Sequence, residues 1–295
     1  MKNIFLTGGK GFIGKHFMER YESSFYIDAP SRQQLELTDV KAVEAYFSQK
    51  KFDYIIHGAN VGGTRKNQLP SLTCLNENIR AFSSVYRNRE TVKRFIQLGS
   101  GAEYTRPLPL SKIEESYLEK NVPADEYGFS KLICSQLVKA EPPEKTVVLH
   151  LFGVFGPYED YQARFISNAI VRTLHDLPII INQDVKFDYL YVKDCVRIMH
   201  AFIDQIPLFS HYNLGTGEPI QLSEIAEVVK KVLGTHNKIV IKNSGLGHEY
   251  TCNNDRLKEF LGKNFRFTPL EEAVREMAAW YEKQTLNMEW VKNPL

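Results

Sequence analysis

A phenol and an amine four positions apart form the pair of side chains in this sequence that is best suited to chemistry. They belong to Tyr127 and Lys131, in the stretch Tyr-Gly-Phe-Ser-Lys. Positions four apart lie on one face of a helix, so both side chains would point the same way. A nearby ammonium favours the ionised form of a phenol, which makes the phenol a usable proton donor and acceptor near neutral pH. Such pairs also occur by chance on surface helices, so the rest of the chain must decide.

The amino-terminal part of the chain carries a glycine-rich turn of the kind that binds phosphates. An apolar run at 4–6 leads into Thr-Gly-Gly-Lys-Gly-Phe-Ile-Gly at 7–14, and residues 15–21 can form a helix. In this context Gly8 permits the tight turn, Gly11 lets a pyrophosphate approach the backbone, and Gly14 lets the helix pack closely on its strand. The amides at the helix N-terminus would then bind the phosphates. A glycine-rich hairpin is a poorer explanation, because it does not account for the helix.

The elements that would position these residues alternate along the first half of the chain. Expected strands lie at 4–6, 25–29, 35–37, 54–57, 95–98 and 146–152, and expected helices at 15–21, 40–47 and 78–87, with Asp39 as a possible N-cap of the second. The Tyr127–Lys131 helix would precede the strand at 146–152. This alternation predicts an α/β fold with a doubly wound parallel sheet, which binds ligands at the carboxyl ends of its strands.

After residue 152 the pattern becomes irregular, which indicates a smaller substrate-binding region interleaved with the last strands of the sheet. We expect a nucleotide-binding domain at 1–152 plus about 185–205, and a substrate-binding region at 153–184 and 206–295. Ser223 precedes an expected helix that stops at Gly234. Thr268 opens a capping box, with proline at the first helical position, ahead of a helix at 273–281.

Composition excludes several classes of function. The chain has 295 residues, 43% of them hydrophobic, which is enough for a core of one or two domains. A formal charge of +2 without a basic block argues against nucleic acid or an anionic membrane as partner. No apolar stretch reaches a membrane-spanning length and the start of the sequence leads directly into a strand, so we expect a cytoplasmic protein. The four scattered cysteines are expected to be reduced core residues, with no disulfide and no metal site.

With both motifs in view, the sequence resembles the extended short-chain dehydrogenases/reductases, the group that contains nucleotide-sugar epimerases, dehydratases and ketoreductases. Residues 7–14 match the group's T-G-x-x-G-F-I-G, and residues 127–131 its Y-x-x-x-K. Four further stretches follow in the group's order: Gly-Ser-Gly-Ala-Glu-Tyr at 99–104, Gly-Val-Phe-Gly-Pro at 153–157, Asp-Tyr-Leu-Tyr-Val-Lys-Asp at 188–194 and Tyr-Asn-Leu-Gly-Thr-Gly at 212–217. The resemblance covers essentially the whole chain. It implies a Rossmann doubly wound parallel sheet with a smaller interleaved C-terminal substrate domain, and a homodimer.

The resemblance also implies a catalytic set of Ser100, Tyr127 and Lys131. Tyr127 would exchange a proton with a sugar oxygen while a hydride moves between the sugar carbon and the nicotinamide. Lys131 would hold the nicotinamide ribose and favour the phenolate, and Ser100 would hydrogen-bond the same sugar oxygen. Taken alone, Ser100 could equally be a turn residue at a strand end.

The choice between NAD and NADP depends on where the second strand ends. Asp28 lies twenty residues after Gly8, where an acidic side chain would bind the ribose hydroxyls and favour NAD. The short spacing to the next strand suggests instead an end near Ser31, so that Arg32, helped by Lys10, would meet a 2′-phosphate. Both cations could also be solvated surface residues. We favour NADP(H), with NAD as the alternative. The predicted cofactor-binding residues are Gly8, Lys10, Gly11, Phe12, Ile13, Gly14, Arg32, Glu36, Leu37, Gly58, Ala59, Asn78, Lys131 and Phe152.

Departures from the group narrow the expected reaction. The 4,6-dehydratases carry Asp-Glu directly after the catalytic Thr, where this chain has Gly101 and Ala102. The GDP-fucose synthases resemble this chain at 59–63 and 31–39, yet Ala102 replaces their epimerising Cys and their His has no evident counterpart. What remains is redox chemistry at one carbon, in a 4-ketoreductase or an NAD-dependent 4-epimerase. A preference for NADPH favours the reductase.

The substrate side offers fewer matches. His150 and Gly153 replace an Arg and an Asn that are usual in relatives. The predicted substrate-binding residues are Asn60, Glu103, Arg164, Lys186 and His248. We expect a reductase of a keto group, at C4, of a nucleotide-activated sugar. The alternatives are a nucleotide-sugar 4-epimerase and a non-catalytic dinucleotide sensor, and the presence of all three catalytic residues argues against the sensor.

Overall fold

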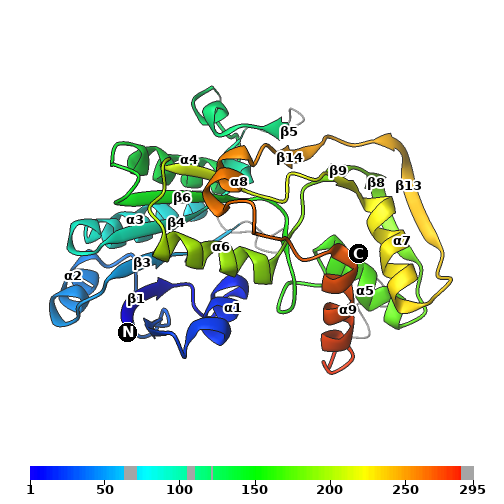
Figure 1. Cartoon of the computed structure of the whole chain (residues 1–295), viewed down its shortest axis with the longest axis horizontal. Coiled ribbons are helices and arrows are strands. Elements are labelled where there is room, and N and C mark those ends of the chain that lie inside the picture. The colour runs from blue at the N-terminus through cyan, green and yellow to red at the C-terminus, as the bar shows by residue number, and fades with distance from the viewer. Residues whose placement is uncertain (63–71, 105–109, 121, 287–295) are drawn as a thin grey trace.

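The computed structural model describes residues 1–62, 72–104, 110–120 and 122–286. Its centre is a six-stranded sheet in which every neighbouring pair of strands is parallel (Figure 1). In sheet order the strands are β11 (His211–Leu214), β6 (Thr146–Leu151), β4 (Arg94–Ser100), β3 (Tyr54–His57), β1 (Lys2–Thr7) and β2 (Phe25–Asp28). The order reverses after β2, because β3 joins the opposite side of β1. Such a reversal leaves a crevice at the carboxyl ends of β1 and β3, where sheets of this kind bind ligands.

Helices cover both faces of this sheet. On one face lie α1 (Phe12–Tyr21), α6 (Val192–Asp204) and α8 (Asp255–Leu261), and on the other lie α2 (Val40–Gln49), α3 (Thr73–Tyr86) and α4 (Glu126–Lys139). Ile4 and Leu6 enter the core under the first three helices, and Phe5 enters the core under the other three. Since successive side chains of a strand point to opposite faces, a strand buried on both sides reads as a continuous apolar run. The predicted α/β fold class is confirmed.

A second group of helices lies beside the sheet, at the right in Figure 1. It contains α5 (Phe165–Leu174), α7 (Leu222–Leu233) and α9 (Leu270–Tyr281), which share an apolar core with β8 (Ile179–Asp184), the parallel partner of β13 (Ile239–Leu246). Short strands run between the two groups: a four-stranded sheet of β12 (Ile220–Gln221), β9 (Lys186–Phe187), β14 (Tyr250–Cys252) and β5 (Leu110–Ile113), and the pair β10 (Leu190–Tyr191) and β7 (Val154–Phe155). The described elements are completed by three 3-10 turns, η1 (Arg89–Thr91), η2 (Gly101–Glu103) and η3 (Glu115–Glu119).

The division of the chain expected from the sequence differs from the sheet topology in two places. Residues 206–295 were assigned to the substrate-binding region, yet β11 is an edge strand of the main sheet and α8 shares that sheet's core. Conversely, β5 and β9 come from segments assigned to the nucleotide-binding domain but belong to the four-stranded sheet. Strands of two to four residues are too short to show a reliable period, which is why the pattern missed them. That the second group of helices contributes substrate-binding residues remains a prediction.

The expected strand at 35–37 is absent, because this described segment forms turns. The Glu36 carboxylate accepts hydrogen bonds from the backbone amide and the hydroxyl of Thr38, at 3.0 and 2.9 Å. A side chain that binds the backbone two residues further on competes with strand pairing. In addition, β2 ends at Asp28, earlier than the end near Ser31 that the spacing suggested.

The helix ends confirm two expected caps and correct a third. Asp39 caps α2 through the Ala42 amide, and Gly234 ends α7 with a φ of 65°. The residue before α7 is Gln221, which forms a capping box with Glu224, so Ser223 is not the cap. The hydroxyl of Ser223 is already bound to a carboxylate of β8.

The capping box expected at Thr268 is not formed. Pro269 is the residue that precedes α9, and it makes no side-chain cap. The backbone amide and the hydroxyl of Thr268 instead donate to Asp194, at 2.7 and 3.0 Å. Because Asp194 lies in the first turn of α6, this contact ties α6 to the segment that leads into α9.

The remaining composition-based expectations concern cysteines, membranes and metals. All four cysteines lie in the described part of the chain, where they are buried and free, as expected. No described helix is long and apolar enough to cross a membrane. Across the described residues, no group of three or more His, Cys, Asp or Glu side chains is arranged to hold a metal ion.

Candidate active site

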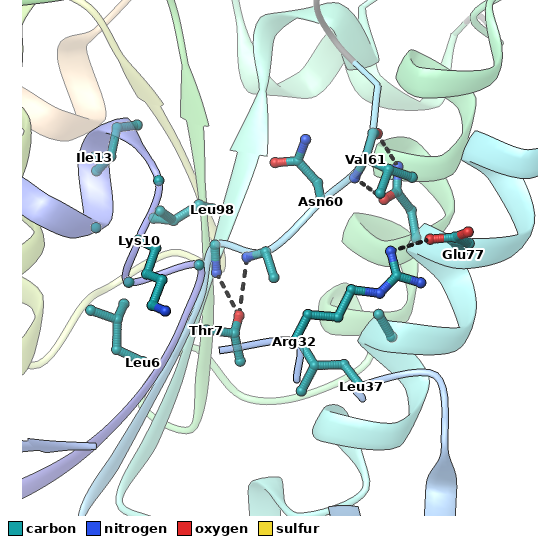
Figure 2. A pocket seen from close by; sticks show the side chains of 18 of the residues that line it. Leu6, Thr7, Lys10, Ile13, Arg32, Leu37, Asn60, Val61, Glu77 and Leu98 are labelled. Carbon is teal, nitrogen blue, oxygen red and sulfur yellow. Dashed lines mark hydrogen bonds and ion pairs between the residues drawn. The ribbon is translucent and has the colours of Figure 1, made fainter. Parts of the chain in front are cut away.

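A cavity of about 590 Å³ opens at the carboxyl ends of β1 and β3, where the strand order reverses. Its walls come from the loop after each of these strands, from the start of α1, and from α3 and α4 (Figure 2). The predicted site residues that line it are Gly8, Lys10, Gly11, Phe12, Ile13, Gly14, Arg32, Glu36, Leu37, Gly58, Ala59, Asn60, Asn78, Tyr127 and Lys131. The fold therefore brings the two sequence motifs, more than a hundred residues apart, to one cavity.

The glycine loop packs so tightly that a residue with a side chain is disfavoured at two of its glycine positions. Gly8 has a φ of 78°, a conformation that side chains disfavour. A Cβ on Gly14 would lie 2.2 Å from the carbonyl oxygen of Gly8. The loop closes with a hydrogen bond of 2.9 Å from the Gly11 amide to that same oxygen, and α1 begins at the next residue. The N-terminus of α1, with its amides and the positive end of its dipole, thus forms a wall of the cavity, as a pyrophosphate site requires.

Thr7 joins the glycine loop to the loop after β3, a role that the sequence reasoning did not assign. Its hydroxyl oxygen accepts hydrogen bonds from the amides of Gly58 and Ala59, at 3.1 and 3.0 Å, and lies 2.9 Å from Nδ1 of His57. Burial, with a smaller contribution from the charge of Lys131, lowers the pKa of His57 to about 3. The ring is therefore neutral and Nδ1 can accept the hydroxyl proton of Thr7. The leading threonine of the T-G-x-x-G motif was the available signal.

Asn78, on α3, fixes the next part of this loop. Its side chain accepts from the Val61 amide at 2.8 Å and donates to the Val61 carbonyl at 3.0 Å. The same side-chain nitrogen lies 3.0 Å from the hydroxyl of Ser130 on α4. Figure 2 shows Asn60, next to Val61, in the wall of the cavity. One asparagine therefore connects the cavity loop to both helices.

Tyr127 and Lys131 lie on α4 and both line the cavity, as their spacing predicted. Asp125 caps this helix through the Gly128 amide, at 2.8 Å. Lys131 is 4% exposed and its ammonium donates to the carbonyl of Leu98 at 2.9 Å. The ammonium lies 5.9 Å from the centre of the Tyr127 ring.

Ser100 lies at the end of β4, half-buried and outside the residues that line the cavity, although its neighbour Gly99 does line it. Its hydroxyl oxygen accepts a hydrogen bond of 3.1 Å from the Ala102 amide. Because that bond uses a lone pair, the hydroxyl proton is still available to a ligand. The structure thus places Ser100 beside the cavity, and its contact with a substrate stays a prediction.

The wall of the cavity also contains a cation and two carboxylates. Arg32 donates from Nε to Glu36 at 2.7 Å, and its Nη1 lies 3.2 Å from Glu77, as Figure 2 shows. Lys10 lies across from Arg32 on the glycine loop. The Asp28 carboxylate is instead bound by the Tyr46 hydroxyl and the Lys50 ammonium, at 2.8 and 2.6 Å. Asp28 is therefore already engaged on α2, and the cavity wall at this position carries Arg32.

Some predicted residues lie away from the cavity. Phe152 is fully buried, with its ring centre 5.8 Å from that of Tyr104 and 4.9 Å from that of Tyr250, so it is a core residue and not a cofactor contact. Glu103 is also fully buried and cannot touch a substrate. Arg164, Lys186 and His248 are exposed, and none of them lines the cavity. Their predicted contacts with a substrate are not supported by this arrangement.

The cavity fits a nicotinamide dinucleotide. Its glycine loop leaves the backbone open to phosphates, and its volume matches that of a small-molecule site. Its walls also carry the Tyr127–Lys131 pair and Arg32. The sequence reasoning also missed Glu77, which reaches the cavity from α3. Nothing in the sequence placed it beside Arg32, because the two meet only through packing of α3 on the sheet.

Comparison with known proteins agrees with this geometry. The family model described as "NAD dependent epimerase/dehydratase family" matches residues 4–215. The chain belongs to this family. The prediction of an extended short-chain dehydrogenase/reductase is thereby confirmed, as is that of an NAD(P)-dependent enzyme.

Two relatives with curated names have different activities. A GDP-L-fucose synthase from Arabidopsis thaliana is 24% identical over 259 residues, which cover 80% of this chain and 79% of the relative. A UDP-glucose 4-epimerase from Caenorhabditis elegans is 24% identical over 344 residues, which cover 95% of this chain and 98% of the relative. Among solved structures, a GDP-mannoheptose C4 reductase from Campylobacter jejuni with NADP bound has a TM-score of 0.80 at 17% identity, covering 96% of this chain and 98% of its own. At this identity the structural likeness establishes the fold.

Proposed function

We propose that this protein uses NADPH to reduce the keto group at C4 of a nucleotide-activated sugar. The observation that carries the proposal is that Tyr127 and Lys131 share a cavity with a phosphate-binding glycine loop and with Arg32. The similarity to a GDP-L-fucose synthase and to an NADP-bound C4 reductase supports both the reaction and the cofactor.

The proposed roles belong to Tyr127 and Lys131, which line the cavity, and to Ser100, which lies beside it. A bound nicotinamide supplies the hydride that the carbonyl carbon accepts. Tyr127 donates a proton to the carbonyl oxygen, and the ammonium of Lys131 stabilises the phenolate that remains until solvent reprotonates it. The hydroxyl of Ser100 donates a hydrogen bond to the same oxygen. The enzyme thus handles one proton, and no acid–base pair is needed at a second carbon.

The preference for NADP(H) rests on Arg32 and Lys10. A guanidinium beside a phosphate forms charge-assisted hydrogen bonds, and a second cation adds to the attraction. One observation favours the alternative, an NAD-dependent 4-epimerase. Arg32 is already paired with Glu36 and Glu77, whose charges oppose a 2′-phosphate. The 24% identity to a UDP-glucose 4-epimerase points the same way.

Purified protein separates these two functions. We expect NADPH to raise the melting temperature more than NADH, and we expect NADPH absorbance to fall when a nucleotide 4-keto sugar from a UDP, GDP, CDP and dTDP panel is added. Tightly bound NAD in the purified protein, together with interconversion of two sugars without added cofactor, would show that the epimerase assignment is the correct one.

Two further proposals accompany this function. We expect a homodimer, on the resemblance stated above, and a cytoplasmic location, on the composition of the sequence. Light scattering on the purified protein measures the first, and a mass equal to one chain of 34.0 kDa would contradict it.

A further inference from the structure

A carboxylate and two imidazoles lie buried directly behind the strand end that carries Ser100. Glu103 and His150 are fully buried and His211 is 7% exposed. Oε2 of Glu103 lies 3.1 Å from Nδ1 of His150, and Nε2 of His150 lies 3.0 Å from Nδ1 of His211. The contact between Glu103 and His150 is a close approach of a carboxylate to an imidazole, and its geometry is not that of a hydrogen bond.

The carboxylate of Glu103 also holds the backbone of Ser100. Its Oε1 accepts a hydrogen bond of 2.7 Å from the Ser100 amide, while the Ser100 hydroxyl accepts one from the Ala102 amide. Together these contacts form a capping box around η2. Capping boxes usually lie at exposed helix ends. In this one the Glu103 carboxylate is fully buried, and the box includes Ser100, the residue predicted to bind the substrate oxygen.

The strand has room for this arrangement because residue 99 has no side chain. A Cβ on Gly99 would lie 2.5 Å from Oε1 of Glu103 and 3.1 Å from Nδ1 of His150. Gly99 is paired with His150 across β4 and β6, and it also lines the cavity. Gly99 is thus the residue that separates the Glu103–His150 contact from the cavity.

The charges support an ionised Glu103. Burial would raise the pKa of Glu103, but the nearby His150 ring and the hydrogen bond from the Ser100 amide hold the pKa below its usual value. Burial lowers the pKa of His211 to about 3, so that ring is neutral. A buried carboxylate needs polar partners, and the Ser100 amide and the His150 ring are placed to be those partners.

We propose that the Glu103–His150 pair is a positioning device for Ser100, in which the carboxylate fixes the Ser100 backbone and the imidazole holds the carboxylate in place. A buried ion pair contributes little to stability compared with apolar side chains of similar size, so stability alone does not explain the pair. Orientation of Ser100 does explain it, because one carboxylate oxygen of Glu103 binds the Ser100 amide and the other contacts His150. This inference rests on the proposed reductase function.

Three variants, compared with the wild type and with Ser100→Ala, test the proposal. Glu103→Gln keeps a carbonyl oxygen for the Ser100 amide, so we expect kcat within about three-fold of the wild type. Glu103→Leu combined with His150→Leu removes the pair but keeps apolar packing, so we expect kcat to fall to the level of Ser100→Ala with an unchanged KM for NADPH. Adding Ser100→Ala to the Leu/Leu variant should cause no further loss, since residues that act as one unit are not additive.

Hydrogen exchange gives a readout that needs no substrate. We expect the Ser100 amide to exchange faster in the Leu/Leu variant and at nearly the wild-type rate in Glu103→Gln. Gly99→Ala should push the Glu103 carboxylate aside and so also speed exchange of the Ser100 amide. This variant replaces the Leu/Leu variant in the test if the latter does not fold. Wild-type exchange and kcat in the Leu/Leu variant, or losses that add to that of Ser100→Ala, would overturn the proposal. If the wild type reduces no keto sugar, the reductase function fails while the exchange data still decide the positioning.

Discussion

At the scale of single residues, the proposed chemistry depends on how Lys131 is held. Its ammonium is buried and donates to the Leu98 carbonyl, and it lies 5.9 Å from the ring of Tyr127. One of its three N–H groups is used in that bond, so the others can serve a ribose hydroxyl. The charge is costly to bury, and a role in the proposed reaction explains why it is buried here.

Tyr127→Phe should remove the proton donor without changing the cavity. We expect kcat to fall by about 10²–10⁴-fold, the usual contribution of a positioned acid. Neither NADPH binding nor the melting temperature should change, because the ring is kept. Tyr26→Phe, the same substitution at a residue that is 59% exposed on β2, is the matched control and should leave kcat unchanged. Equal kcat values for wild type and Tyr127→Phe would remove Tyr127 from the mechanism.

Arg32 and Glu77 should affect the choice of cofactor in opposite directions. Arg32→Gln removes the cation expected to bind the 2′-phosphate, so NADPH should bind about ten- to a hundred-fold more weakly, with little change for NADH. Glu77→Gln removes a carboxylate 3.2 Å from that guanidinium, so NADPH should bind more tightly. Fluorescence titration with both cofactors measures the two constants. If the Arg32→Gln variant bound NADH more weakly than NADPH, Arg32 would not be the residue that recognises the 2′-phosphate.

At the scale of elements, the close contact between the glycine loop and α1 determines whether the cavity can bind a dinucleotide. Residue 14 lies in the first turn of α1 and has no space for a side chain. The amides at this helix end can reach a phosphate only while the helix stays against the loop. This packing requires glycines at the spacing seen in the sequence, so the glycine loop and the helix after it were predicted correctly.

Gly14→Ala should therefore move α1 away from the loop. We expect it to cost about 1–3 kcal/mol in the free energy of unfolding, the range for overpacking, and to weaken NADPH binding as well. Gly234→Ala is the matched control, because a Cβ there meets nothing within 4 Å. It should cost about 1–2 kcal/mol through its left-handed backbone and leave NADPH binding unchanged. Urea unfolding and cofactor titration check both variants; normal NADPH binding by Gly14→Ala would contradict the proposed phosphate site.

The segment before α5 carries an acid whose ionisation depends on folding. The side chain of Glu159 is 6% exposed, and its Oε2 accepts a hydrogen bond of 2.7 Å from Ser167 on α5. Burial raises the pKa of Glu159 to about 7. Because the folded pKa lies above the unfolded value, Glu159 stabilises the fold at low pH, and this contribution is lost as the pH rises through about 7.

Glu159→Gln should abolish this pH dependence, because the amide resembles the protonated acid at every pH. Between pH 5 and pH 8 the wild type should lose about 2 kcal/mol of unfolding free energy more than the variant does. Urea unfolding at the two pH values measures the difference, and all other titrating groups cancel in the comparison. Parallel curves would show that Glu159 is ionised in the folded protein throughout this range.

At the scale of the whole molecule, the sheet and the second group of helices meet at Tyr158. Its hydroxyl donates to Glu19 on α1 at 2.7 Å, and its ring centre lies 5.2 Å from that of Trp280 on α9. His16, also on α1, contacts the carbonyl of Pro157 at 3.0 Å. The helix that begins at the glycine loop is thus in direct contact with both groups.

The sequence predicted the parts of this architecture that depend on neighbours along the chain. The strands at 54–57 and 95–98, the glycine loop and the Tyr127–Lys131 face each follow from local pattern. Contacts across the fold could not be predicted in this way. Glu103 turned into the core toward His150, and Glu77 reached Arg32 from another helix. The short strands β9 and β12, two residues each, formed only because the second group of helices brings them together.

The most direct test of the account is to follow the hydride. We would incubate the protein with NADPH deuterated at the transferable position and with the nucleotide 4-keto sugar that it consumes, and locate the deuterium in the product by NMR. The account predicts one deuterium at C4 of the sugar, formed at a rate that Tyr127→Phe lowers by about 10²-fold or more. A product without deuterium, or one that forms without added NADPH, would contradict it.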